Sequence, residues 1–207
     1  MKIVEPNVIL ETPIDRDEIL RSLERYGRTC YKSEAQITME SASRFVRSLI
    51  KRGHESVLEH INITVRIICD RGISHELVRH RHASYSQEST RYCNYKDCDI
   101  AFIAPSALRV NTVPYVVWKE SCQRAEHDYN TLIKCHVTPD IARSVLPNSL
   151  KTEIVMTANL REWRHFLKLR YIGTTGKPHP DMKIIAEKIY SIFITYLPEI
   201  FDSLETN

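Results

Sequence analysis

The order of apolar and polar residues along the chain predicts a mixture of strands and helices. Residues 61–67 alternate apolar and polar side chains, as a strand with one buried face does. Longer segments repeat apolar residues every three to four positions, which indicates helices with a buried stripe. The segments with this helical spacing are 15–26, 41–51, 115–135, 159–170 and 180–204. Short apolar runs at 3–4, 8–10 and 100–103 predict further strands, and 153–157 fits either a strand or a buried helix.

Glycine, proline and capping residues set the expected ends of these elements. Gly27 is expected to stop the first helix and Gly53 to cap the second. Ser74 is expected to cap a short helix that leads into a basic stretch, and Thr138-Pro139 to open a helix containing Arg143. Residues 83–94 favour a loop or an irregular strand. Because helices and strands do not alternate strictly, we predict an α+β fold with a central, mostly antiparallel sheet packed with long helices.

Length and composition predict one soluble domain covering residues 1–207. The chain has 207 residues, a mass of 24.2 kDa and 43% hydrophobic residues, which is enough for a substantial core. No apolar run approaches the roughly 18 residues that cross a bilayer. The first residues lack the apolar region of a secretory signal. We therefore expect a cytoplasmic protein that does not associate with membranes.

The cysteines do not predict a metal site. Only Cys93 and Cys98 lie close together, and no second pair completes a zinc-binding set. The other four are scattered along the chain: Cys30, Cys69, Cys122 and Cys135. We expect reduced thiols and no bound metal.

The most informative segment is basic and rich in hydroxyl groups. Arg79-His80-Arg81 is followed after seven residues by Ser89, and then by Arg91. Arginine side chains match the oxygens of phosphate, and serine hydroxyls and loop amides satisfy the remaining acceptors. If Arg79 ends a helix, Arg81 projects about 200° away from it, so the pair could hold two anions on opposite sides. The alternative is a solvated basic turn without a ligand.

The pattern Arg-His-Arg, seven residues, Ser resembles that of the flavin-dependent thymidylate synthases. The resemblance runs from about Arg28 to the final helix and is strongest between residues 53 and 92. The chain departs from the family in having Ser86-Gln87 where many members have Asn-Glu. It also has Glu76 where a glutamine is common, and His165 where an asparagine is frequent.

The segment His54-Glu55-Ser56-Val57-Leu58-Glu59-His60 allows three interpretations. Its histidines are six positions apart, whereas the zinc motif of helical metalloproteases needs four. A packed, hydrogen-bonded cluster of His and Glu side chains is the second interpretation. The resemblance implies the third, in which Ser56 contacts flavin.

Two further basic segments also have structural alternatives. Arg143 lies in an apolar helix and could reach solvent or form an ion pair; the resemblance implies that it binds the nucleotide phosphate. Arg161 and His165 share a helical face, as in an ordinary basic surface; the resemblance implies that Asn159 and this face meet the flavin. It places Arg170 at the pyrimidine ring. An insertion at 173–177 leaves open whether His179 also contacts flavin.

The resemblance implies a homotetramer with FAD at subunit junctions. The implied reaction is the reductive methylation of dUMP to dTMP, with methylenetetrahydrofolate as carbon donor and NADPH as reductant. Arg170 is the expected catalytic residue, polarising the uracil ring, and no cysteine nucleophile is required. The expected flavin-binding residues are Ser56, Arg79, His80, Arg81, Gln87, Asn159, Leu160, Arg161 and His165. The expected nucleotide-binding residues are Glu76, Arg79, Gln87, Glu88, Ser89, Thr90, Arg91, Arg143 and Arg170.

Two competing functions remain at this point. One is a flavoprotein of the same architecture with another substrate. The other is a nucleic-acid-binding module in which Tyr85, Tyr92 and Tyr95 stack bases beside the arginines. The net charge of only +3 and the lack of a recognisable binding fold argue against the second, so we expect no nucleic-acid partner.

Overall fold

The computed structural model describes residues 1–93, 95 and 99–204. Contacts between Cα atoms group them into two compact units. The first unit comprises Met1–Val8, Arg66–Arg79 and Tyr85–Val155. The second comprises Ile9–Val65, His80–Ser84 and the described part of Met156–Asn207. The assignment of a single domain stays a prediction.

The α+β fold with an antiparallel sheet is confirmed. Four strands have the spatial order β2-β3-β6-β4, with bounds Asn7–Leu10, Asn62–Asp70, Lys151–Asn159 and Ala83–Gln87. Burial alternates along β3 and β6, so the segment that allowed a strand or a helix is a strand. A separate two-stranded parallel sheet joins β1 (Lys2–Ile3) to β5 (Ala101–Phe102).

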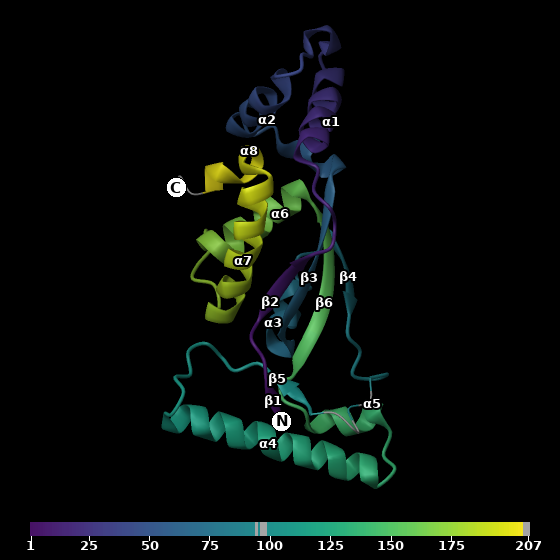
Figure 1. Cartoon of the computed structure of the whole chain (residues 1–207), viewed down its shortest axis with the longest axis vertical. Helices are drawn as coiled ribbons and strands as arrows, with labels where there is room; N and C mark the ends of the chain where they lie inside the picture. Colours follow the sequence, from purple (N-terminus) through teal and green to yellow (C-terminus); the bar gives the residue numbers. More distant parts are fainter. Residues whose placement is uncertain (94, 96–98, 205–207) are drawn as a thin grey trace. The chain divides into compact units, whose positions relative to one another are not determined.

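The first unit contains α3 (Arg71–Leu77), α4 (Val113–Lys134), α5 (Pro139–Ala142) and the 3₁₀ turn η3 (Arg143–Val145). In Figure 1, α4 is the long teal helix. Its buried face packs with β5, since Cys122 and Tyr129 share a core with Phe102.

Two expectations about the helices of the first unit fail. The side chain of Asp70, not Ser74, caps α3, because β3 extends to Asp70 and delivers its carboxylate to the amide of Ile73 at 2.9 Å. The helix expected to contain Arg143 ends at Ala142 and continues only as η3.

The second unit is mainly helical. Its elements include α1 (Arg16–Thr29), η1 (Glu34–Gln36), α2 (Ser41–Lys51), η2 (Glu55–His60) and α6 (Leu160–Leu167). The π-helical turn η4 (Lys168–Ile172), α7 (Pro180–Tyr196), α8 (Pro198–Phe201) and η5 (Asp202–Leu204) complete it. Figure 1 shows α1 beside α2, and α6 beside α7. Trp163 packs edge-on against Phe193, with ring centroids 5.3 Å apart.

The final helix is shorter than predicted because Pro198 interrupts it. Proline lacks a backbone N–H and starts helices more readily than it continues them. The predicted segment 180–204 is therefore divided into α7, α8 and η5. The five described cysteines are free, and Cys98 lies outside the described residues. Among the described helices, none has the length and apolarity to cross a membrane.

Gly27 does not stop α1, which continues to Thr29. Its role is close packing between α1 and α2. A Cβ atom at this position would lie 2.7 Å from Cε1 of Phe45. The guanidinium of Arg28 lies over the same ring, 4.7 Å from its centroid. The glycine thus permits the two helices to approach.

We expect Gly27→Ala to lower the free energy of unfolding. Overpacking costs about 1–3 kcal/mol, which exceeds the roughly 0.5–1 kcal/mol that alanine gains over glycine inside a helix. Urea denaturation of the variant measures the change. As a control, the same substitution in a Phe45→Leu background should cost less, and equal costs in both backgrounds would contradict the packing role.

Candidate functional site

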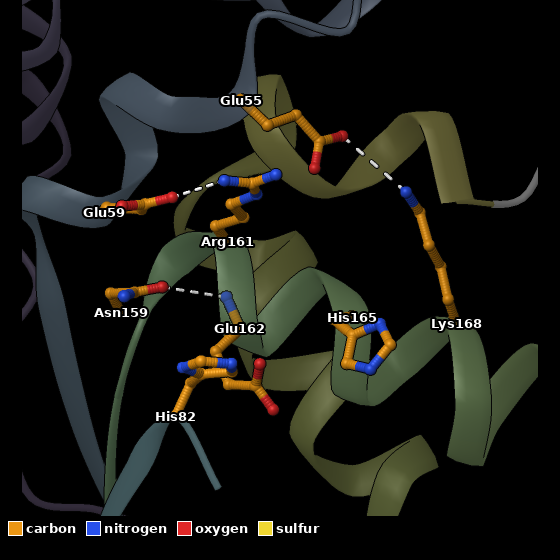
Figure 2. Close-up of a pocket in the computed structure, with 8 residues that line it drawn as sticks. All are labelled: Glu55, Glu59, His82, Asn159, Arg161, Glu162, His165 and Lys168. Atoms are coloured by element: carbon orange, nitrogen blue, oxygen red, sulfur yellow. Dashed lines mark hydrogen bonds and ion pairs between the residues drawn. The ribbon is translucent and has the colours of Figure 1, made fainter. Parts of the chain in front are cut away.

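A cavity of about 580 Å³ in the second unit brings together polar residues from η2, the end of β6, α6 and η4, and from the position just before β4 (Figure 2). Its lining residues are Glu55, Glu59, His82, Asn159, Arg161, Glu162, His165 and Lys168. Three of them, Asn159, Arg161 and His165, belong to the residues expected to bind flavin. His82, Lys168 and the three carboxylates were not predicted.

The start of α6 determines how this cavity is lined. Asn159 ends β6 and caps α6, because its Oδ1 accepts a hydrogen bond from the amide of Glu162 at 2.9 Å. Arg161 and His165 follow one helical turn apart and both line the cavity, as Figure 2 shows. The prediction that they share a face is thus confirmed. The side chain of Leu160 is instead fully buried.

The carboxylates of η2 are paired with cations of α6 and η4. Glu59 forms a close ion pair with Arg161, and both side chains are about half exposed. Glu55 lies 3.1 Å from Nη2 of the buried Arg164 and 3.7 Å from Nζ of Lys168. These contacts join the two glutamates of residues 54–60 to cations of other elements rather than to the histidines of the segment, so the cluster of His and Glu side chains stays a prediction. Among the described residues, no group of three or more His, Cys, Asp or Glu side chains is arranged to hold a metal ion.

His80 lies inside the second unit and links α6 to η4. It is only 5% exposed. Its Nδ1 lies 3.2 Å from Oε1 of Glu162, and Nε of Arg170 donates to its Nε2 at 3.2 Å. Burial, the largest influence, lowers the pKa of His80, while the hydrogen bond to Glu162 works against burial. Accepting from Arg170 requires an unprotonated Nε2, so the neutral ring carries its proton on Nδ1 and donates it to Glu162.

Residues of the first unit form a second polar cluster around the loop after β4. Nη1 of Arg143 donates to the buried hydroxyl of Thr90 at 3.1 Å, and its Nε donates to the carbonyl of Asp140. The pKa of Asp140 is lowered mainly by a hydrogen bond from Thr138, and also by the charges of Arg91 and Arg143. Residues 89–91 and Arg143 are therefore neighbours, although they are distant in sequence. Arg143 remains exposed and is not buried in an apolar helix.

A cavity of about 490 Å³ lies next to β4 and β6 in the same unit. Lys151 connects two carboxylates there, Glu153 at 2.6 Å and Glu88 at 3.2 Å. Burial lowers the pKa of Lys151, but its bonds to Glu153 and Glu88 outweigh burial and raise it. Gln87 donates to Ser74 at 2.9 Å and to Thr152 at 3.2 Å.

No sequence motif indicated Lys151, Glu153 or Arg66, which all line this cavity. A signal for them existed in the sequence. They occupy the less buried positions of the alternating strands β3 and β6, which face away from the core. Charged residues at those positions mark a polar face of the sheet.

The remaining predicted residues have varied positions. Helix α3 ends at Leu77, so Arg79 lies beyond the helix rather than at its last residue. Arg79 belongs to the first unit and Arg81 to the second, and both are exposed. Glu76 is half buried in α3, and Ser56 is exposed in η2.

The expected ligand residues divide by unit. The nucleotide set lies in the first unit except for Arg170, and the flavin set lies in the second except for Arg79 and Gln87. His179 caps α7, accepting from the amide of Asp181 at 3.2 Å, and does not line the 580 Å³ cavity.

Comparison with known proteins supplies the family. The model of the family described as "Thymidylate synthase complementing protein" matches residues 14–199. A flavin-dependent thymidylate synthase of Mycolicibacterium gilvum is 30% identical over 216 residues, covering 95% of this chain and 84% of the relative. That of Thermococcus onnurineus is 44% identical over 121 residues, which are 57% of this chain and 49% of the relative.

The fold also matches a solved structure. A UMP/dUMP methylase, PolB, from Streptomyces cacaoi bound with 5-Br dUMP superimposes with a TM-score of 0.83 at 22% identity. The match covers 100% of this chain and 97% of that one.

Proposed function

Since this chain belongs to the thymidylate synthase complementing protein family, we propose that it converts dUMP to dTMP by reductive methylation. Methylenetetrahydrofolate donates the carbon, and NADPH donates electrons through FAD. The family match over residues 14–199 is the observation that carries this proposal. The two polar clusters supply groups suited to the ligands of such a reaction.

The cavity of the second unit fits an anionic cofactor with a polar ring system. Arg161 and Lys168 provide positive charge at its wall, and Asn159, His82 and His165 provide further hydrogen-bonding groups. Of the carboxylates lining it, Glu59 is paired with Arg161 and Glu55 with Arg164 and Lys168, whereas Glu162 is buried and accepts a hydrogen bond from the neutral His80. We propose that this wall, with Ser56 and Arg81, holds FAD. Bound FAD would supply the redox chemistry of the reaction.

The cluster of the first unit fits the phosphate of a nucleotide. Arg91 and Arg143 carry positive charge, and Ser89 and Thr90 add hydroxyl groups beside them. A phosphate dianion needs several such donors at once. We assign Arg79, Glu76 and Glu88 to the same nucleotide. Gln87 is neutral and donates to Ser74 and Thr152, so we expect it to contribute hydrogen bonding rather than charge.

Arg170 is our candidate for polarising the pyrimidine. Carbon 5 of uracil is a weak nucleophile, and loss of the N3 proton raises its electron density. A guanidinium close to the ring stabilises the resulting anion. Ser89 has its hydroxyl accepting from the amide of Arg91, which suits a binding role better than a nucleophilic one.

We further propose a homotetramer in which each site draws residues from several chains. Light scattering of the purified protein tests the oligomeric state. A monomer that turns over dUMP at a full rate would contradict the shared site.

The reaction is tested with purified protein, FAD, methylenetetrahydrofolate and NADPH. We expect NADPH oxidation that depends on dUMP, with stoichiometric dTMP measured by chromatography. UMP and NADH serve as alternative substrates that define specificity. A yellow protein that oxidises NADPH without forming dTMP would indicate a flavoprotein with another substrate. A colourless protein with salt-sensitive affinity for oligonucleotides would support the nucleic-acid alternative.

We expect Glu59→Gln to strengthen FAD binding. Glu59 now competes with an anionic ligand for Arg161, and exposed ion pairs are worth roughly 0.2–1 kcal/mol. The dissociation constant should fall about 1.5- to 5-fold, and less at high salt. Fluorescence titration of the apoprotein measures it. The control Glu34→Gln removes an exposed carboxylate of η1 and should change nothing; weaker FAD binding by Glu59→Gln would contradict the assignment of Arg161.

A further inference from the structure

The Glu162–His80–Arg170 chain joins a buried carboxylate to the guanidinium assigned to the pyrimidine. Glu162 is 6% exposed and His80 is 5% exposed, so both stay inside the second unit. Arg170 is half buried and lies in η4, immediately after α6. Each of the two contacts in this chain is a hydrogen bond with a donor and an acceptor. The chain can therefore orient the three side chains as well as pack them.

The direction follows from the hydrogen atoms. Nε of Arg170 always carries a proton and donates it to Nε2 of His80. The ring must therefore place its own proton on Nδ1, where Glu162 accepts it at 3.2 Å. The carboxylate of Glu162 thus favours the imidazole tautomer with its proton on Nδ1, and in this tautomer Nε2 can accept the hydrogen bond from Arg170. Asn159 in turn anchors Glu162 by capping α6 through its amide.

We propose that His80 is a positioning residue which, held in one tautomer by Glu162, fixes the plane of the Arg170 guanidinium for the reaction on the pyrimidine. This inference rests on the proposed function of Arg170. A guanidinium fixed through Nε cannot rotate about its last side-chain bond without breaking this hydrogen bond. Such preorganisation matters most where charge develops in the transition state, so its loss lowers kcat more than it raises KM.

The arrangement also makes Arg170 sensitive to protonation of His80. The groups that face the ring include Glu162, His165 and Phe166 from α6 and Arg170 from η4. A protonated ring would present Nε2–H to the N–H of Arg170 and add a like charge. Because burial lowers the pKa of His80, the neutral form persists below the usual value of 6.5. Turnover should fall as the pH falls through that lowered pKa.

The test compares His80→Leu, which has no acceptor, with His80→Gln, whose amide oxygen accepts but whose side chain does not titrate. Although His80 was among the residues expected to bind flavin, it is buried and does not line the 580 Å³ cavity, so we expect His80→Leu to keep FAD. The variant should lose about ten-fold or more in kcat and change KM for dUMP less than three-fold or so. His80→Gln should recover part of kcat and lack the acidic fall attributed to His80. Equal kcat values for the two variants with the wild-type pH profile would overturn the proposal.

A double-mutant cycle separates this inference from the proposed function. If His80 acts through Arg170, His80→Leu should have almost no further effect in an Arg170→Ala background. Full additivity would overturn the positioning role while leaving Arg170 in the mechanism. Normal turnover by Arg170→Ala alone would instead refute the proposed role of Arg170.

A spectroscopic measurement needs no turnover. ¹⁵N NMR of histidine-labelled wild-type protein reports which ring nitrogen carries the proton, and His80→Gln identifies the signal. We expect protonation at Nδ1 at neutral pH; protonation at Nε2 would overturn the proposal. His127→Gln, an exposed position on α4 of the first unit, is the matched control and should leave kcat and its pH profile unchanged.

Discussion

Arg170→Ala is expected to retain FAD and to lose most dTMP formation. The substitution removes the cation assigned to the pyrimidine but none of the residues that line the 580 Å³ cavity. Loss of one preorganised electrostatic group of this kind costs about 100- to 1,000-fold in kcat. Single-turnover formation of dTMP, with FAD occupancy from visible absorbance, measures both parts of the expectation.

The matched control is Arg124→Ala, which removes an exposed arginine from α4. It should leave turnover unchanged. Arg170→Lys keeps the charge but removes the Nε donor to His80, so we expect an intermediate rate. Near-normal turnover by Arg170→Ala would exclude this residue from the chemistry.

Arg143→Ala is expected to weaken dUMP binding. In the structure its guanidinium donates to Thr90 and lies in the same cluster as Arg91, where a phosphate would find several donors. Removing one charge-assisted contact costs about 1.5–3 kcal/mol, which is roughly a 10- to 150-fold rise in Kd. Calorimetric titration with dUMP measures this change.

Two comparisons test whether the expected loss of dUMP affinity in Arg143→Ala comes from a lost contact with the phosphate. Deoxyuridine lacks the phosphate, so its affinity should be nearly the same in wild type and Arg143→Ala. Arg109→Ala removes an exposed arginine elsewhere in the first unit and should bind dUMP normally. An unchanged dUMP affinity of Arg143→Ala would contradict the phosphate assignment.

The sequence predicts most of the helices because their signals are local. Residues 41–51 carry a regular apolar stripe and end before Gly53, and α2 has these bounds. The failures arise from information that is distant in the chain. Gly27 looks like a helix stop until Phe45 is seen against it, and Asp70 could be recognised as a cap only once the length of β3 was known.

The site is predictable to a smaller extent, for the same reason. A motif shows that Arg143 and Thr90 belong to functional segments, but their contact spans 53 positions. The partner of His80 is harder still to predict from the sequence. No sequence motif marks Glu162, which lies in the first turn of α6, 82 positions away, and only the fold brings its carboxylate to the imidazole. The residue types therefore predict which ligands the protein binds better than they predict which contacts hold the binding side chains in place.

The π-helical turn Lys168–Ile172 has a consequence for how this segment tolerates changes in length. A π turn contains an extra residue compared with an α-helix, so every residue within it is shifted around the helix axis. Deleting one residue of the turn would let α6 continue in regular α-helical geometry. Arg170 would then rotate by about 100° per residue removed and lose its alignment with the imidazole. Insertions and deletions should be accepted in the Gly173–Lys177 connection but selected against in the five residues that precede it.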